Sequence, residues 1–244
     1  MSTLTTSFVK RLRARDESAW FELWEIFGPV LRAQLTKWGR GRVGAETVRD
    51  LTQETLAALS NSIDRYDPNR GARFSTWLLS IAKHALGDEI DRRMALKRGG
   101  GKRPAEFDES FMGAASVEAD EVYERGVFGA KVYAAIRKAE RELDFVQFQV
   151  YTMRVFEGIP GKSVAEQLGV SEPTVSRHLH RVRDTLRQRL REVVSTYSFT
   201  EEELSELDAA GLGGDDGMFD EALCDIYTSQ SRLVEDDAGA SESY

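Results

Sequence analysis

Apolar residues recur along the chain at intervals of three and four, and no stretch shows sustained alternation of apolar and polar positions. This spacing is typical of amphipathic helices, so we expect an all-α protein. The first long helix should begin after Asp16, a good N-cap residue, and Gly28-Pro29 should kink it or briefly break it. Its apolar stripe consists of Trp20, Leu23, Trp24, Phe27, Leu31, Leu35 and Trp38.

Two more helices are expected in the first hundred residues, at about 45–63 and 74–93. The segment between them, 66–71, contains Asp, Pro, Asn and Gly, which favour a turn. We therefore predict a first small helical domain at 7–94. The residues expected to face its core are Val48, Leu51, Thr55 and Leu59 in one helix and Trp77, Leu78, Ile81 and Ala85 in the other.

The helical pattern lapses after this domain and then returns. Residues 95–127 hold a basic, glycine-rich run followed by small and acidic residues, a composition that predicts a flexible linker. The apolar spacing of three and four resumes at Val132. We therefore expect a second small helical domain at 128–195.

Residues 196–244 form an acidic C-terminal extension that we expect to be largely disordered. The extension contains 14 Asp or Glu residues and a single basic residue, Arg232. Two local signals for order lie within it. Thr200 and Glu203 have the spacing of a capping box, and an apolar cluster at 218–227 indicates transient helices or a docking peptide.

The net charge of −8 is distributed unevenly along the chain. Without the extension, 32 basic and 27 acidic residues remain, so the rest of the chain carries +5. A mildly basic body is compatible with a nucleic-acid partner, and the extension then becomes a candidate regulatory element. Composition leaves open the alternative of a tail that only solvates a neutral protein.

Composition also excludes several classes of protein. A single cysteine, Cys224, cannot form an internal disulfide, and His178 and His180 would point in different directions from one helix. The chain has no long uncharged apolar run, and residues 1–15 lack the pattern of an export signal. We expect a cytoplasmic protein without membrane insertion, metal or cofactor.

The segment 163–183 has the pattern of a helix-turn-helix. Gly169 permits the turn, Ser171 can cap the second helix, and Pro173 is tolerated in its first turn. We favour DNA binding over a helical hairpin with a solvated basic face, because the turn residues and the clustered arginines coincide. The side chains expected to reach a major groove are Glu172, Thr174, Ser176, Arg177, His180 and Arg181.

An acidic face is expected on the helix at 45–63, where Glu46, Asp50 and Glu54 are spaced by four and accompanied by Gln53. Like charges at this spacing destabilise an isolated helix by about 0.2–0.5 kcal/mol per pair. A basic partner surface would compensate for this repulsion, and a solvated acidic face remains equally open. Acid–base catalysis is not expected, because nothing apolar surrounds these carboxylates to raise a pKa.

A third cluster of candidate residues spans the predicted turn and the helix that follows it. Basic and aromatic groups alternate there, a combination suited to single-stranded nucleic acid, whose phosphates pair with cations while its bases enter pockets or stack. Trp77 is expected in the core. The candidate contacts are Asn69, Arg70, Arg73, Phe74, Ser75, Lys83 and His84.

In this order, and separated by a linker, the three clusters resemble the sigma-70 family of bacterial RNA polymerase sigma factors. The resemblance is to the small extracytoplasmic-function group and covers about residues 7–194. Residues 50–54 resemble the segment that grips the clamp helices of the polymerase, 66–84 the segment that captures and melts the −10 element, and 174–183 the segment that reads the −35 element.

The resemblance implies an alternative sigma factor, not an enzyme, that binds core RNA polymerase and directs promoter-specific initiation. Glu46, Asp50, Gln53 and Glu54 would dock on polymerase, and promoter DNA would bind as duplex and as a single non-template strand. His84 stands where the family commonly has Asn. The extension is expected either to cover the helix-turn-helix or to bind an anti-sigma factor or another regulator. An ordinary helix-turn-helix regulator that binds duplex DNA without polymerase is the main alternative.

Overall fold

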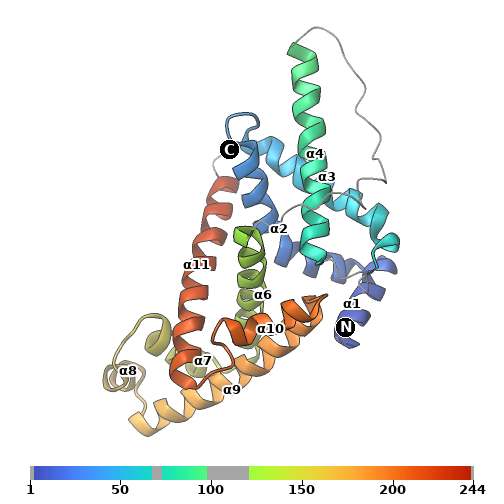
Figure 1. Cartoon of the computed structure of the whole chain (residues 1–244). Coiled ribbons are helices and arrows are strands. Elements are labelled where there is room, and N and C mark those ends of the chain that lie inside the picture. Colours follow the sequence, from blue (N-terminus) through green and yellow to red (C-terminus); the bar gives the residue numbers. More distant parts are fainter. Residues whose placement is uncertain (1–2, 68–72, 98–120, 243–244) are drawn as a thin grey trace. The chain divides into compact units, whose positions relative to one another are not determined.

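The computed structural model describes residues 3–67, 73–97 and 121–242, with side chains described as far as Arg232 (Figure 1). All regular structure in these residues is helical, and they contain no strand. The all-α prediction is therefore confirmed. The chain divides into two compact units, one made chiefly of residues 6–127 and the other of residues 128–239.

The first unit is built on three long helices. Asp16 caps α2, because its carboxylate accepts from the backbone N–H groups of Ser18 and Ala19 at 2.9 and 3.2 Å. The elements are α1 (Thr3–Arg13), α2 (Glu17–Gly39), α3 (Ala45–Ser62), the short 3₁₀ turn η1 (Ile63–Arg65) and α4 (Phe74–Lys97).

The expected break at Gly28-Pro29 does not occur, since α2 runs without interruption from Glu17 to Gly39. Proline inside a helix removes one backbone hydrogen bond and crowds the preceding turn, at a cost of about 3 kcal/mol. Here the residues on either side are anchored, because Phe27, Val30 and Leu31 are all buried. Tertiary packing against α3 and α4 thus overrides the local signal.

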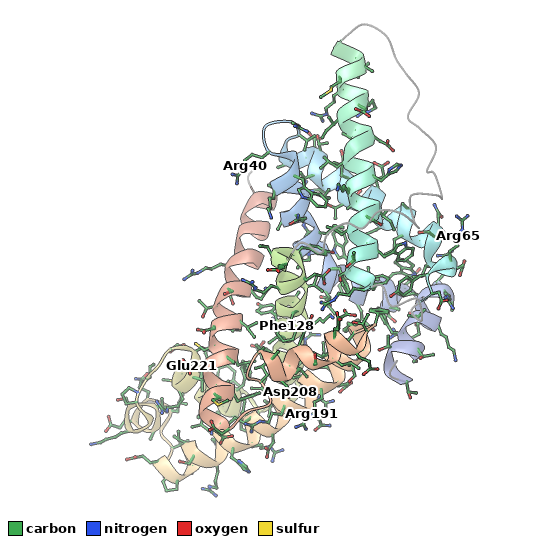
Figure 2. The ribbon with its side chains drawn as sticks, viewed as in Figure 1. Arg40, Arg65, Phe128, Arg191, Asp208 and Glu221 are labelled. Atoms are coloured by element: carbon green, nitrogen blue, oxygen red, sulfur yellow. The ribbon has the colours of Figure 1, made fainter. Side chains whose placement is uncertain are left out.

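An aromatic cluster fixes the start of α4. Phe74 is fully buried, and its ring meets Phe27, Tyr66 and Trp77 edge to face at centroid distances of 5.4, 5.3 and 5.8 Å. Tyr66 also stacks on the half-buried Trp77 at 4.8 Å. Arg40, after the end of α2, and Arg65, next to Tyr66, are exposed, and their side chains extend away from the helices (Figure 2).

Helices extend into both ends of the predicted linker. α4 continues to Lys97, and α6 (Glu121–Glu142) begins seven residues before the predicted second domain. Residues 98–120, the middle of that linker, lie outside the described residues.

The second unit follows along α6 and contains the predicted helix-turn-helix. Its core includes Val150, Met153, Val164, Ala165 and Val175, which bring the helices α7, α8 and α9 together. The further elements are α7 (Phe145–Tyr151), the π-helical turn η3 (Thr152–Phe156), α8 (Gly161–Leu168), α9 (Glu172–Tyr197), α10 (Glu201–Ala209) and α11 (Asp216–Glu242).

The prediction of a largely disordered extension is wrong, because α10 and α11 are helical and belong to the same compact unit as α9. The capping box is present, with Thr200 and Glu203 exchanging side-chain to backbone hydrogen bonds. The extension also brings its own apolar side chains into the core, where Phe199, Phe219 and Leu223 are almost completely buried. These contacts offset the entropy of ordering an acidic segment.

A buried ion pair ties α10 to α6. Lys131 Nζ lies 2.9 Å from Glu203 Oε1, and the two side chains are 1% and 2% exposed. Lys131 also donates to Ser198 Oγ at 3.3 Å. The second carboxylate oxygen of Glu203 accepts from the backbone N–H groups of Phe199 and Thr200 at 2.8 and 3.0 Å. Each charge is therefore surrounded by partners that replace water.

We predict that Lys131→Met lowers the free energy of unfolding of the full chain by about 3–5 kcal/mol, because it leaves a buried carboxylate without its counter-charge. Urea unfolding followed by circular dichroism would measure the change. Lys138→Met is the matched control, since Lys138 lies on the same helix and pairs with Glu192 at 2.6 Å but is 42% exposed. That control should lose less than about 1 kcal/mol. Equal losses would contradict the prediction.

Candidate nucleic-acid interface

The helix-turn-helix is held by a small set of local interactions. Gly169 ends α8 with φ +65°, a left-handed conformation that glycine adopts without strain, and Val170 N–H donates to Ala165 O at 3.0 Å. Ser171 then caps α9 by accepting from Thr174 N–H at 3.3 Å, with Pro173 in the first turn. The turn residues identified in the sequence therefore act as expected.

The N-terminal half of α9 presents polar side chains to solvent. Arg177 donates to the half-buried Thr174 hydroxyl at 2.9 Å, and His180 Nε2 lies 3.5 Å from Asp184. This surface combines cations with hydrogen-bonding groups, as contacts with phosphates and base edges require. The exposed residues of the predicted set are Glu172, Ser176, Arg177, His180 and Arg181.

Two arginines further along α9 continue this surface. Residues that lie four, seven and eleven positions after Ser176 share its face of the helix. These residues are His180, Arg183 and Arg187. Arg183 closes the segment 163–183 predicted as a helix-turn-helix but was not among the predicted contacts, and Arg187 lies beyond that segment. The spacing from Ser176 was the signal that could have identified both.

Carboxylates of α11 hold these two arginines. The hydrogen bond with Asp220 raises the pKa of the Arg183 guanidinium, and the hydrogen bond from Arg187 lowers the pKa of the Asp216 carboxyl. Tyr151 donates to Asp220 at 2.8 Å, and burial raises the pKa of this tyrosine. Both shifts favour the charged forms of Arg183 and Asp216, which are therefore ionised at neutral pH.

The acidic face of α3 is exposed along its whole length, at Glu46, Asp50, Gln53 and Glu54. The opposite face carries Val48, Leu51, Thr55 and Leu59, and all four are buried, as the pattern predicted. Burial on one side thus fixes α3 so that its carboxylates point into solvent as a single ridge, which we call the α3 acidic ridge.

The residues predicted to contact single-stranded DNA do not form one exposed surface. Lys83 is exposed, and His84 is half-buried beside Asp88 at 3.8 Å. Arg73 and Ser75 both contact Glu124, at 3.4 and 2.7 Å, in the first turns of α6 that belong to this unit.

Phe74 requires a correction. It lies in the aromatic core and is fully buried, so in this structure its ring is not accessible to a base. Ser75 is 1% exposed and is likewise not presented to solvent. The aromatic at the first position of α4 fills the space above Phe27 and Tyr66, a contact that the sequence pattern could not reveal. Asn69 and Arg70 lie outside the described residues.

No group of three or more His, Cys, Asp or Glu side chains in the described parts of the chain is arranged to hold a metal ion. Among the helices that the structure describes, none is long and apolar enough to cross a membrane.

The two units correspond to two known protein-family models. Residues 27–95 match sigma-70 region 2, and residues 133–186 match sigma-70, region 4. Together these matches span about half of the chain, and the second includes the helix-turn-helix. No curated protein matches the chain significantly. Region 2 and region 4 thus occur in order on two helical units, and the chain belongs to the sigma-70 family, as a promoter-recognising transcription initiation factor of the extracytoplasmic-function type.

Proposed function

We propose that this chain is an alternative sigma factor that binds core RNA polymerase in the cytoplasm and carries it to a specific set of promoters. The observation that carries the proposal is the combination of the α3 acidic ridge with an exposed helix-turn-helix on a second unit of the same chain. A factor that only bound DNA would need the second unit alone.

Docking on polymerase is assigned to the α3 acidic ridge. Glu46, Asp50 and Glu54 repel one another on the free helix, and a basic partner surface would relieve that repulsion. Gln53 adds a neutral hydrogen-bonding group between the charges. Within the part of the chain that the structure describes, no arginine or lysine forms an ion pair with these carboxylates.

Promoter DNA is assigned to two places. The N-terminal half of α9 enters the major groove of the upstream element, where Arg177 and Arg181 contact phosphates or guanine edges. Lys83, His84 and Arg73 on and before α4 follow the backbone of the melted non-template strand, with Asn69 and Arg70 completing that contact. These contacts with the non-template strand form only when the DNA is melted, so their binding energy would favour strand opening without catalysis by this chain.

The decisive experiment is run-off transcription with core polymerase on a library of genomic promoter fragments. Discrete start sites that require both the chain and core polymerase support the proposal. Binding to duplex DNA with no polymerase-dependent start site would instead favour an ordinary helix-turn-helix regulator.

We predict that Asp50→Arg/Glu54→Arg reduces run-off transcripts by about tenfold or more, because the reversed charges repel the basic polymerase surface. Both residues are exposed, so the fold should persist. Co-purification with core polymerase would report the lost binding directly.

Glu17→Arg/Glu25→Arg provides the control for this variant. It makes the same change in net charge at two exposed positions of α2 in the same unit. The control should retain most of its transcription. A comparable loss in the control would show that total charge, and not the α3 acidic ridge, governs binding.

We predict that Arg177→Ala/Arg181→Ala weakens binding to duplex promoter DNA by about 10- to 100-fold, because each arginine contact to a base edge or phosphate is lost. Fluorescence anisotropy on duplex and single-stranded probes would measure the effect. Arg141→Ala, at an exposed position of α6, is the control and should bind nearly as wild type. Loss on single-stranded probes alone would contradict the assignment of α9 to duplex DNA.

A further inference from the structure

One face of α9 is exposed in the N-terminal half of the helix, which belongs to the helix-turn-helix. Further along α9, the C-terminal helix α11 covers the same face. Ser176 and His180 are exposed, whereas the Arg183 and Arg187 side chains that continue the face are only 17% and 21% exposed. The covering residues are the carboxylates Asp216 and Asp220 at the start of α11.

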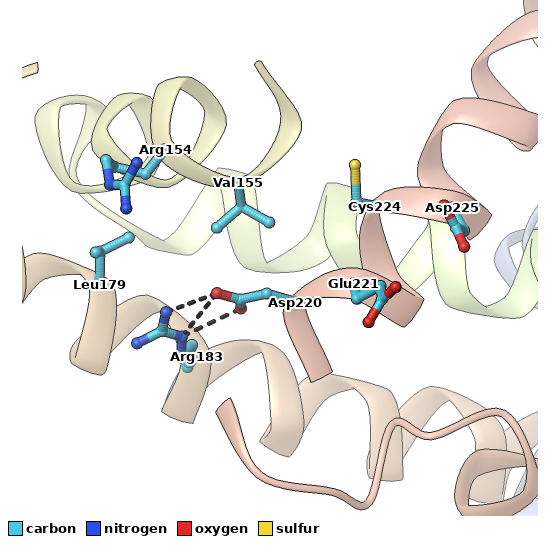
Figure 3. Close-up of a pocket in the computed structure, with 8 residues that line it drawn as sticks. All are labelled: Arg154, Val155, Leu179, Arg183, Asp220, Glu221, Cys224 and Asp225. Atoms are coloured by element: carbon cyan, nitrogen blue, oxygen red, sulfur yellow. Dashed lines mark hydrogen bonds and ion pairs between the residues drawn. The ribbon is translucent and has the colours of Figure 1, made fainter. Parts of the chain in front are cut away.

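Two carboxylates of α11 form ion pairs with two guanidinium groups of α9. Asp220 accepts from Arg183 through both oxygens, with Nε at 3.1 Å from Oδ1 and Nη2 at 2.6 Å from Oδ2. Asp216 bridges the two arginines, at 3.1 Å from Arg183 and 2.9 Å from Arg187. Figure 3 shows Asp220 reaching across from α11 to Arg183 on α9.

Apolar and aromatic side chains dock the helix that carries these carboxylates. Phe219 is fully buried, and its ring lies 4.5 Å under the Arg187 guanidinium. Further along α11, Tyr227 stacks on Phe156 at 4.1 Å and on Tyr133 at 5.8 Å. α11 therefore runs beside α6 and keeps the two carboxylates in register with α9 (Figure 1).

The ion pair between Asp220 and Arg183 lies at the wall of a pocket that is open to solvent. A pocket of about 300 Å³ remains beside Asp220, lined by Arg154, Leu179, Arg183 and Cys224 among others. Figure 3 shows this pocket opening between the two helices.

Carboxylate and phosphate oxygens are interchangeable partners for arginine, since the guanidinium binds either group through two parallel hydrogen bonds. A DNA phosphate placed along the face of α9 would meet Arg183 and Arg187 where the carboxylates now lie. Both anions cannot occupy the guanidinium groups together.

We propose that Arg183 and Arg187 form a phosphate-binding extension of the DNA surface of α9, and that Asp216 and Asp220 occupy it as internal substitutes for two phosphates. Duplex DNA and α11 then compete for the same arginines. This inference rests on the part of the proposed function that assigns duplex DNA to α9, and it makes the acidic extension an inhibitor in cis of promoter binding.

The test compares the full chain with Asp216→Asn/Asp220→Asn on a fixed duplex DNA, by fluorescence anisotropy over a range of salt concentrations. The amides keep the shape of the side chains but compete poorly with phosphate. We expect about tenfold tighter binding at low salt, and a salt dependence steeper by about two units of slope because two more phosphates are neutralised. Unchanged affinity and slope would overturn the inference.

Glu221→Gln/Asp225→Asn is the matched control. It removes two negative charges from exposed positions of the same helix, and neither residue pairs with Arg183 or Arg187 in the described contacts. The control should bind DNA within about twofold of the wild type. Equal tightening in both variants would show general repulsion by an acidic helix, and would overturn the competition for specific arginines.

Hydrogen exchange on the unmodified chain provides a second measurement that does not depend on how the variants fold. Saturating duplex DNA should increase amide exchange in residues 218–230, because α11 must release the arginines. Retained protection of α11 in the DNA complex, or no duplex binding by any variant, would overturn the inference.

Neither measurement includes polymerase, so a failure of polymerase-dependent transcription alone would count against the proposed function and leave the competition intact.

Discussion

The buried ion pair between Lys131 and Glu203 is the constraint on which the second unit depends. A charge enclosed in the core must be met by an opposite charge and by hydrogen bonds, because an unpaired ion there costs several kcal/mol. Glu203 meets Lys131 with one oxygen and closes the turn from α9 to α10 with the other. The start of α10 is thereby fixed on α6, and the short connection through Gly211, at φ +81°, directs α11 back along the unit.

The positions of individual charged side chains matter more in this chain than its net charge of −8. The extension is strongly acidic, but its carboxylates are used one by one. Glu203 neutralises a buried lysine, and Asp216 and Asp220 neutralise two arginines of α9. The α3 acidic ridge is the contrasting case, because its carboxylates face solvent. Carboxylates therefore form ion pairs within the second unit, whereas on α3 they remain available to a partner.

Elements whose signals are local could be predicted from the sequence. The bounds of α3, the N-cap at Asp16 and the turn at Gly169 and Ser171 depend on neighbouring residues and were found correctly. Features that depend on distant partners were missed. Phe74 became core through Phe27 and Tyr66, and Phe219 ordered the extension by packing under Arg187. Of the candidate site, the exposed residues of α3 and α9 were predictable, whereas the covering of Arg183 and Arg187 was not.

The length of α9 adds a mechanical consequence. Its 26 residues make a rod of about 39 Å at 1.5 Å per residue. The near end belongs to the helix-turn-helix, while Leu190, Val193 and Tyr197 at the far end are buried where α10 begins. A tilt of only about 5° at that end moves the opposite tip by about 3 Å, the length of one hydrogen bond. If α9 reads DNA as proposed, a small repacking around α10 would shift the helix-turn-helix along the DNA, far from any residue proposed to contact a base.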